Sequence, residues 1–219
     1  MLVQFMQLIK NTEMKYYFCY MLLLISAFTG RAQEDPGAIL DKVSALMQSY
    51  NTIQADFSFS LENKDADIYD TYEGSLVMQA EKFRLSIMGM LAFSDGKTMW
   101  VYMEEFNEAN IMDPAESDFF NPKTIFNIYK EDYKLRYLGK ENGLNRVELI
   151  PLEENENYKL LILNTDPLKN QIKEVFYEGL DGNNYIIKIK NMLTDIQVDD
   201  RFFIFDKSKY PGVEVYDMR

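Results

Sequence analysis

Apolar and polar residues alternate along much of this chain, a pattern typical of β-strands whose two faces meet different surroundings. Residues 52–62 show it most clearly, because the odd-numbered positions from Ile53 to Leu61 are apolar and the positions between them are polar. One face of this strand is expected to be dry and the other wet. The same reasoning, with turn pairs such as Asp95-Gly96 as boundaries, predicts strands at 68–79, 82–89, 90–94, 97–103, 107–112, 133–139, 145–151, 158–164, 171–178, 184–190 and 202–205.

Two segments, 36–50 and 118–130, depart from this alternation. The first follows Asp35, which suits the N-cap of a helix, and its apolar residues recur at helical spacing. The second would place Ile125 and Phe126 on one face of a helix. This second helix is either an ordinary packing helix or a lid over a pocket.

Together these elements predict a mainly β protein with helices, of the α+β class. An antiparallel sheet of about eleven strands must curl, close or split, and two helices are too few to cover it flat. We therefore expect a curled antiparallel sheet whose concave side is filled by the helices.

The amino-terminal residues are predicted to be a secretory signal peptide rather than part of the fold. Lys15 precedes an apolar run over 16–28, and the small residues Gly30 and Ala32 precede a cut before Gln33. The run is shorter than the ~20 residues of a membrane-spanning helix. A short membrane anchor is the alternative interpretation.

This prediction divides the chain into a leader, 1–32, and a single domain, 33–219. Met1–Glu13 would add polar residues ahead of the leader, so we interpret it as an upstream start. Cys19, the only cysteine, lies within the leader and follows no small-residue lipid-attachment motif. The exported domain would hold no disulfide and would depend on its core alone.

Composition excludes several classes of chemistry. The chain has no histidine and one cysteine, so Ser-His-Asp and Cys-His catalysis and the usual zinc sites are not expected. It carries no phosphate-binding loop and no dinucleotide fingerprint, so we predict no enzyme activity and no cofactor. A net charge of −12 repels phosphate backbones and anionic membrane surfaces, which argues against nucleic-acid binding.

The carboxylates offer no clear metal or catalytic site. Asp65–Asp70 faintly resembles a calcium loop but lacks the required glycine and the closing glutamate. Asp195–Asp200 contains three acidic residues, which are more commonly solvated surface groups. Nothing in the sequence singles out the carboxylate pair that a glycosidase needs.

Two longer stretches carry a specific resemblance. "GSLVMQAEKFRLSI" (74–87) and "SDGKTMWVYMEEFNEANI" (94–111) contain a Gly-x-Leu strand, a Lys-Phe-Arg strand and an Asp-Gly-Lys-Thr-x-Trp turn. In this order they resemble the signature region of the outer-membrane lipoprotein carrier family, LolA. The closing "DDRFFIFDKSKYPGVEVYDMR" (199–219) is similar to that family's Phe-x-Phe strand and tail, as in its Bacteroidetes-type members.

The resemblance implies an incomplete antiparallel β-barrel with a helical lid over a hydrophobic cavity. It also implies a monomeric periplasmic carrier that holds the acyl chains of lipoproteins in this cavity. It would accept this cargo from an ATP-driven inner-membrane transporter, the lipoprotein-releasing ABC transporter, and deliver it to the outer membrane, in some cases through a receptor. Many related chains tie their lid with an arginine. Met78, Gln79 and Ala80 stand at that motif here, so this role is not carried over.

The strand 97–103 is apolar on both faces, which raises the question of what covers each. We predict that Trp100 and Tyr102 face the cavity, while Met99, Val101 and Met103 pack on the convex side under a neighbouring segment or in a docking patch. A shift of one residue would exchange the two faces. The predicted cavity residues are Phe57, Phe59, Leu85, Ile87, Trp100, Tyr102, Ile125 and Phe126; for each, plain core packing is the alternative.

Three other functions stay open at this point. The chain could bind another lipid or apolar small molecule on the same fold. It could be a sensor of mislocalised lipoproteins, which would need an added domain or tether. It could be a hydrolase, although the missing nucleophile–base sets count against that reading.

Overall fold

The computed structural model describes residues 34–116, 132–153 and 158–219, which belong to one compact unit, Glu34–Arg219. The predicted leader and the predicted helix of 118–130, with Ile125 and Phe126, lie outside the described residues. Among the described helices, none is long and apolar enough to cross a membrane.

One twelve-stranded sheet forms the unit, in the order β12-β6-β5-β4-β3-β2-β1-β11-β10-β9-β8-β7. The strands are β1 (Thr52–Asn63), β2 (Ile68–Gln79), β3 (Lys82–Ile87), β4 (Met90–Ser94), β5 (Met99–Met103), β6 (Glu108–Met112), β7 (Tyr133–Glu141), β8 (Leu144–Pro151), β9 (Tyr158–Asp166), β10 (Gln171–Gly179), β11 (Asn184–Thr194) and β12 (Glu214–Asp217). Short 3-10 helices are η2 (Pro114–Glu116), η4 (Asp200–Phe203) and η5 (Lys207–Lys209).

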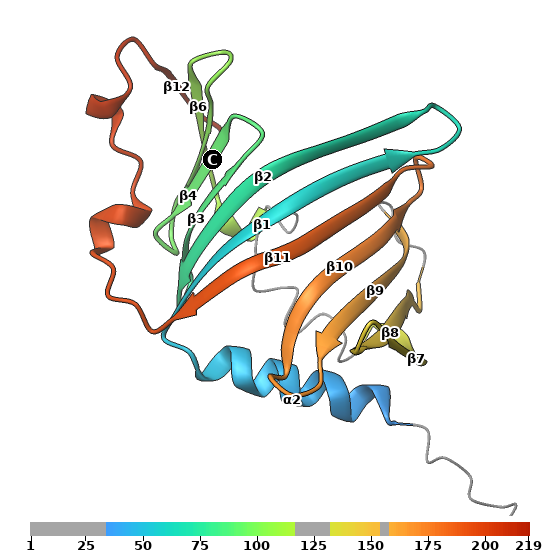
Figure 1. Cartoon of the computed structure of the whole chain (residues 1–219). Coiled ribbons are helices and arrows are strands. Elements are labelled where there is room, and N and C mark those ends of the chain that lie inside the picture. Colours follow the sequence, from blue (N-terminus) through green and yellow to red (C-terminus); the bar gives the residue numbers. More distant parts are fainter. Residues whose placement is uncertain (1–33, 117–131, 154–157) are drawn as a thin grey trace, which may run out of the picture. The chain divides into compact units, whose positions relative to one another are not determined.

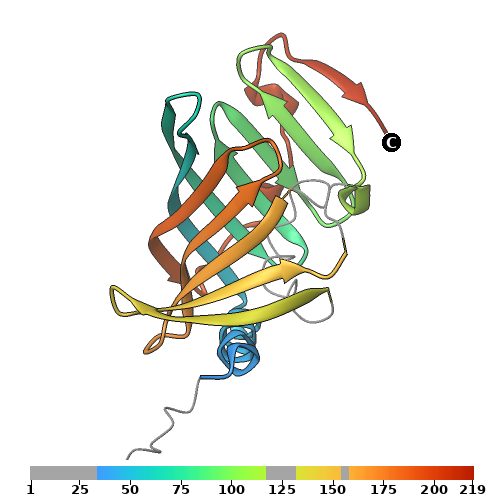
Figure 2. The same cartoon turned by 90° about the vertical axis from the view of Figure 1, so that its right-hand side faces the viewer.

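The sheet curves strongly but does not close, because β12 and β7 are its two edges (Figures 1 and 2). The expected incomplete barrel is therefore observed. Helix α2 (Pro36–Ser49) runs across one end of the strands (Figure 1). The carboxylate of Asp35 caps it by accepting a hydrogen bond from the backbone N–H of Gly37 at 2.9 Å. Its buried side chains are Leu40, Val43, Ser44 and Met47.

The strand predictions are confirmed for β1 to β11, with small shifts at the ends. The predicted strand at 202–205 is wrong. Asp199 caps the 3-10 helix η4 there by accepting from the N–H of Arg201, so the backbone turns instead of extending. The sequence analysis also missed β12, which pairs with β6 in parallel; every other pairing of described strands is antiparallel.

The residues that follow η4 cover part of the outer face of the sheet. We call 199–213 the covering segment. Its Phe205 and Val213 form a buried cluster with Phe93 of β4, Tyr102 of β5 and Ala109 of β6. The apolar residues on the second face of β5 are explained by this cover, since an uncovered antiparallel sheet would present polar side chains there.

Candidate functional site on the inner face of the sheet

Strand pairing places four of the six predicted cavity residues that the structure describes on one face. Phe57 lies opposite Gly74 of β2, and Gly74 lies opposite Ile87 of β3. Leu85 sits two residues before Ile87 and Phe59 two residues after Phe57, so all four predicted residues share a face. This inner face is the one on which α2 packs.

Trp100 and Tyr102 do not belong to it, and their predicted orientation is wrong. Leu85 lies opposite Ala92 of β4, which in turn lies opposite Val101. Met99, Val101 and Met103 are therefore the inner residues of β5, whereas Trp100 and Tyr102 point outward. The sequence of this strand is apolar on both faces, so only its pairing with β4 fixes which face is inner.

Burial along the inner face falls with distance from α2. Near the helix, Ile53, Met78, Phe83 and Met99 are each at most 6% exposed. Farther along this face, on β1, β3, β4, β5 and β11, apolar side chains are only half-buried. We call this half-buried group the inner patch: Phe59, Leu85, Ile87, Met90, Met103 and Ile187.

Gly74 explains the Gly-x-Leu motif on this face. A Cβ atom built on Gly74 would lie 2.4 Å from the Cζ atom of Phe57, far inside van der Waals contact. Only glycine leaves room for the Phe57 ring at this position. The motif therefore has a packing reason, and it holds Phe57 at the boundary between the buried core and the inner patch.

A row of aromatic side chains continues the inner patch across the sheet. Phe59 of β1 contacts Tyr185 of β11, with ring centroids 6.0 Å apart. Tyr185 stacks on Tyr177 of β10 at 4.5 Å and an interplanar angle of 13°. Tyr177 meets the edge of Tyr158 of β9 at 6.2 Å. The row ends where the hydroxyls of Tyr158 and Tyr133 share a hydrogen bond.

The tyrosines of this row give the apolar surface a few polar atoms. Burial raises the pKa of Tyr177, and burial together with the Tyr158 hydroxyl raises the pKa of Tyr133, so both stay neutral. Tyr185 donates to Asp181 at 2.6 Å, and this bond raises the pKa of Tyr185. The arrangement suits a ligand with an apolar body and a small polar group.

The sequence analysis did not find this aromatic row. Each tyrosine occupies an ordinary strand position, and no spacing along the chain relates one to the next. Only the pairing of β11 with β10 and of β10 with β9 brings them together.

The three acidic residues of 195–200 have partners within the protein. Asp195 accepts from the backbone N–H of Asn51, Asp199 pairs with Arg201, and Asp200 pairs with Lys82. Within the part of the chain that the structure describes, no group of histidine, cysteine and acidic side chains could hold a metal ion.

Gln79, at the arginine position of related chains, lies on the outer face. Strand alternation puts Met78 inward and Gln79 outward, opposite Lys82. The Oε1 atom of Gln79 is buried and has no hydrogen-bond partner among the described residues. Its side chain therefore does not reach the inner face, where a lid would have to be held.

Sequence comparison links the chain to known carriers. The protein family described as "Outer membrane lipoprotein carrier protein LolA" matches residues 25–168. An "Outer-membrane lipoprotein carrier protein" from Coxiella burnetii (strain CbuK_Q154) is 21% identical over 182 residues, which cover 80% of this chain and 84% of that protein.

Several solved structures have a fold similar to that of this chain. An uncharacterized conserved protein from Thermus thermophilus aligns with a TM-score of 0.55 at 11% identity, over 83% of this chain and 98% of its own. The LolA superfamily protein NE2245 from Nitrosomonas europaea aligns with a TM-score of 0.43 at 12% identity, over 78% and 98%. At these identities the likeness concerns the fold alone.

Proposed function

This chain belongs to the outer membrane lipoprotein carrier family LolA, and from that premise we propose that its inner face binds the acyl chains of lipoproteins. The observation that carries the proposal is the inner patch. Six large apolar side chains on the concave side of the sheet are only half-buried, while those nearer α2 on the same face are almost fully buried. Apolar surface left open in this way is typical of a ligand-binding hollow.

The free energy of an acyl chain explains why such a hollow is needed. A palmitoyl-length chain has about 15 transferable carbons, which cost roughly 12 kcal/mol to expose to water at ~0.8 kcal/mol each. A carrier must offset most of this cost and still release the chain. A patch that covers the acyl chain only in part meets both needs. The part left in water makes transfer of the chain into the acceptor membrane favourable.

The predicted cellular role follows from the same premise. We propose that residues 1–32 are a signal peptide and that the carrier works in the periplasm as a monomer without catalysis. It would receive lipoproteins from the inner-membrane lipoprotein-releasing ABC transporter and pass them to the outer membrane, with or without a receptor. The net charge of −12 disfavours nucleic acid as a partner.

Neighbouring residues of β11 provide a matched pair of variants for the binding test. Ile187 points inward, opposite Phe59, and Ile186 points outward, opposite Phe176; both are half-buried. With a fluorescent fatty acid as probe, Ile187→Asp should weaken binding about tenfold or more, equivalent to at least 1.4 kcal/mol. Ile186→Asp should bind as the wild type. Equal affinities in the two folded variants would remove the inner patch from the site.

The cargo needs a second experiment. Purified protein lacking residues 1–32 should release lipoproteins from spheroplasts or proteoliposomes, and Ile187→Asp should release fewer. Failure to release any, in an assay where an established carrier does, would reject the lipoprotein assignment.

A second candidate is a carrier of another lipid or apolar small molecule. The stacked rings of Tyr177 and Tyr185 favour it, because such a surface also suits a flat ligand. Mass spectrometry of ligand that co-purifies with the protein separates the candidates: an acylated peptide supports the first and a ring-bearing lipid the second.

A further inference from the structure

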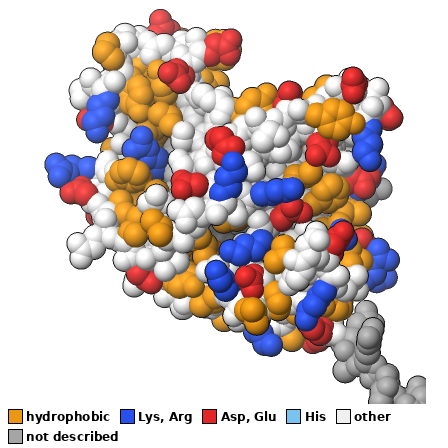
Figure 3. All heavy atoms as spheres, in the orientation of Figure 1, with side chains coloured by type: hydrophobic (Ala, Val, Ile, Leu, Met, Phe, Trp, Pro, Cys, Tyr) orange, Lys and Arg blue, Asp and Glu red, His pale blue; other side chains and the backbone are white. Residues whose placement is uncertain are grey.

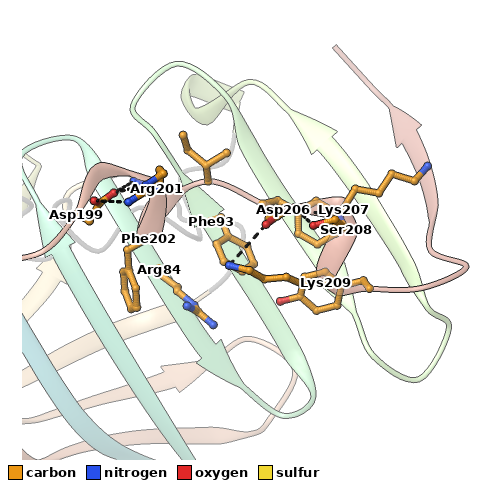
Figure 4. Close-up of a pocket in the computed structure, with 12 residues that line it drawn as sticks. Arg84, Phe93, Asp199, Arg201, Phe202, Asp206, Lys207, Ser208 and Lys209 are labelled. Carbon is orange, nitrogen blue, oxygen red and sulfur yellow. Dashed lines mark hydrogen bonds and ion pairs between the residues drawn. The ribbon is translucent and has the colours of Figure 1, made fainter.

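A pocket lies on the opposite face of the sheet, between β3–β4 and the covering segment. It is open to solvent and has a volume of about 660 Å³. Arg84 of β3 and Phe93 of β4 form its floor, and residues from Asp199 to Tyr210 form the rest (Figure 4). Because Arg84 and Phe93 point outward, this pocket is separate from the inner patch, and nothing in the proposed carrier function uses it.

The pocket is built around Arg84. The central carbon of its guanidinium lies 4.9 Å from the ring centre of Phe93 and 4.7 Å from that of Phe202. In Figure 4 the side chain extends between these two rings. Two aromatic contacts hold the planar group in place and leave its edges, which carry the N–H donors, for a ligand.

Arg84 differs from the other arginines of the described residues. Arg136, Arg146, Arg201 and Arg219 each form an ion pair with a carboxylate. Arg84 forms none with any described residue, although this chain has 35 acidic residues against 23 basic ones. A half-buried guanidinium that pairs with no described carboxylate, in so acidic a protein, suggests a carboxylate supplied from outside.

The surroundings of Arg84 favour an anion that has an apolar part. Arg84, Arg201, Lys207 and Lys209 line the pocket with Asp199 and Asp206, which gives 4 − 2 = +2 charges locally on a chain of −12. The apolar walls are Phe93, Phe202, Ile204 and Phe205. Burial raises the pKa of Tyr210, whose hydroxyl stays a neutral hydrogen-bond donor, and the positive charge of Arg84 opposes this shift.

We propose that this pocket binds a carboxylate attached to an apolar or aromatic group, with Arg84 gripping the carboxylate through two parallel N–H···O bonds. The carboxyl end of a peptide that finishes in an aromatic residue has this chemistry, as does a small aromatic acid. Membrane phosphates fit less well, because the acidic chain as a whole is repelled from anionic lipid surfaces. The site is independent of cargo on the inner face.

N-acetylphenylalanine is a suitable probe, and its amide, which lacks the carboxylate, is the matched control. In an NMR titration of the protein, the acid should shift the backbone amides of 199–210 in a saturable manner, and the amide and inorganic phosphate should not. Arg84→Gln should abolish the shifts. Arg84→Lys, which keeps the charge but loses the planar fork, should weaken binding about tenfold. Arg219→Gln removes an arginine outside the pocket and should bind as the wild type.

Several results would overturn the proposal: no saturable shifts, equal binding of acid and amide, or unchanged binding in Arg84→Gln. Phosphate binding as tight as that of the acid would mark a general anion site and would also overturn it.

A hexapeptide ending in phenylalanine, tested with and without a terminal amide, distinguishes a peptide ligand from a small aromatic acid. Tighter binding of the free-acid peptide identifies a protein partner, and weaker binding identifies a small acid. Fatty-acid binding should be unaffected in Arg84→Gln, so this test does not depend on the outcome at the inner patch.

Discussion

The outer faces of the two halves of the sheet are stabilised in different ways. On β3–β6, Phe93 and Tyr102 are at most 7% exposed because the covering segment packs over them. On β7–β11 no described segment covers the strands, and ion pairs occupy the face instead: Arg136–Glu148, Lys159–Glu178 and Lys188–Glu174. In Figure 3, side chains of both charges are interspersed over the strands, and apolar ones gather where the covering segment runs.

The alternation of apolar and polar residues in a strand depends on whether another segment covers its outer face. Strand β7 alternates half-buried tyrosines and leucine with exposed Lys134 and Arg136, as a strand with one wet face should. Strand β5 has no wet face, since Val101 contacts the core and Tyr102 contacts the covering segment. A strand that is apolar on both faces in an antiparallel sheet therefore predicts a covering segment elsewhere in the chain.

The largest expected effect is the loss of an aromatic ring from the covered half. Phe203 in η4 is fully buried, so Phe203→Ala should lower the free energy of unfolding by about 3–5 kcal/mol. Phe176 of β10 provides the matched change on the uncovered half, where it is half-buried on the outer face. Phe176→Ala should cost only about 1 kcal/mol. Urea unfolding, followed by circular dichroism, measures both, and equal losses would show that the cover contributes no more than a solvated face.

The next effect concerns charge on the uncovered half. Glu148 of β8 has a side chain that is 7% exposed and lies 2.7 Å from the Nε atom of Arg136. Glu148→Gln should lower the free energy of unfolding by about 1 kcal/mol, because the charge-assisted bond is lost at a buried position. Glu73→Gln breaks the exposed pair with Lys190 and should have no measurable effect. If the two variants are equally stable, burial does not strengthen these ion pairs.

Sequence pattern was sufficient for most of the fold. Alternation and turn residues located β1 to β11, because each strand on the open half, and β1 itself, shows one dry and one wet face. The pattern did not predict the structure of 202–205, where the apolar residues lie in and just after a 3-10 helix capped by Asp199. Strand β12 was missed because its pairing with β6 joins distant parts of the chain.

The candidate site was less accessible to sequence reasoning. Phe57, Phe59, Leu85 and Ile87 were assigned to a common face from alternation within β1 and β3. Trp100 and Tyr102 were assigned to the wrong face, since strand β5 offers no polar residue to mark its outer side. The aromatic surroundings of Arg84 had no sequence signal, because Phe202, which contacts its guanidinium, lies far away along the chain.

The smallest expected effect is a pH dependence confined to the cover. Hydrogen bonds from the side chain and backbone of Arg201 lower the pKa of Asp199 to about 2. A carboxyl whose pKa is lower in the folded state adds stability above its unfolded value of ~3.9, and this contribution is lost as the pH falls toward 2. Asp199→Asn should therefore loosen the cover at pH 6 and differ much less from the wild type at pH 2. Trp100, the only tryptophan, packs against the cluster beneath the cover. Its fluorescence, before and during urea unfolding, therefore reports whether the cover has loosened.

Asp166→Asn is the control on the other half. Asp166 holds the β9–β10 turn through the N–H groups of Leu168 and Lys169, which lower its pKa. This variant should leave the Trp100 signal before unfolding unchanged at both pH values; a change would mean that the two halves do not respond separately.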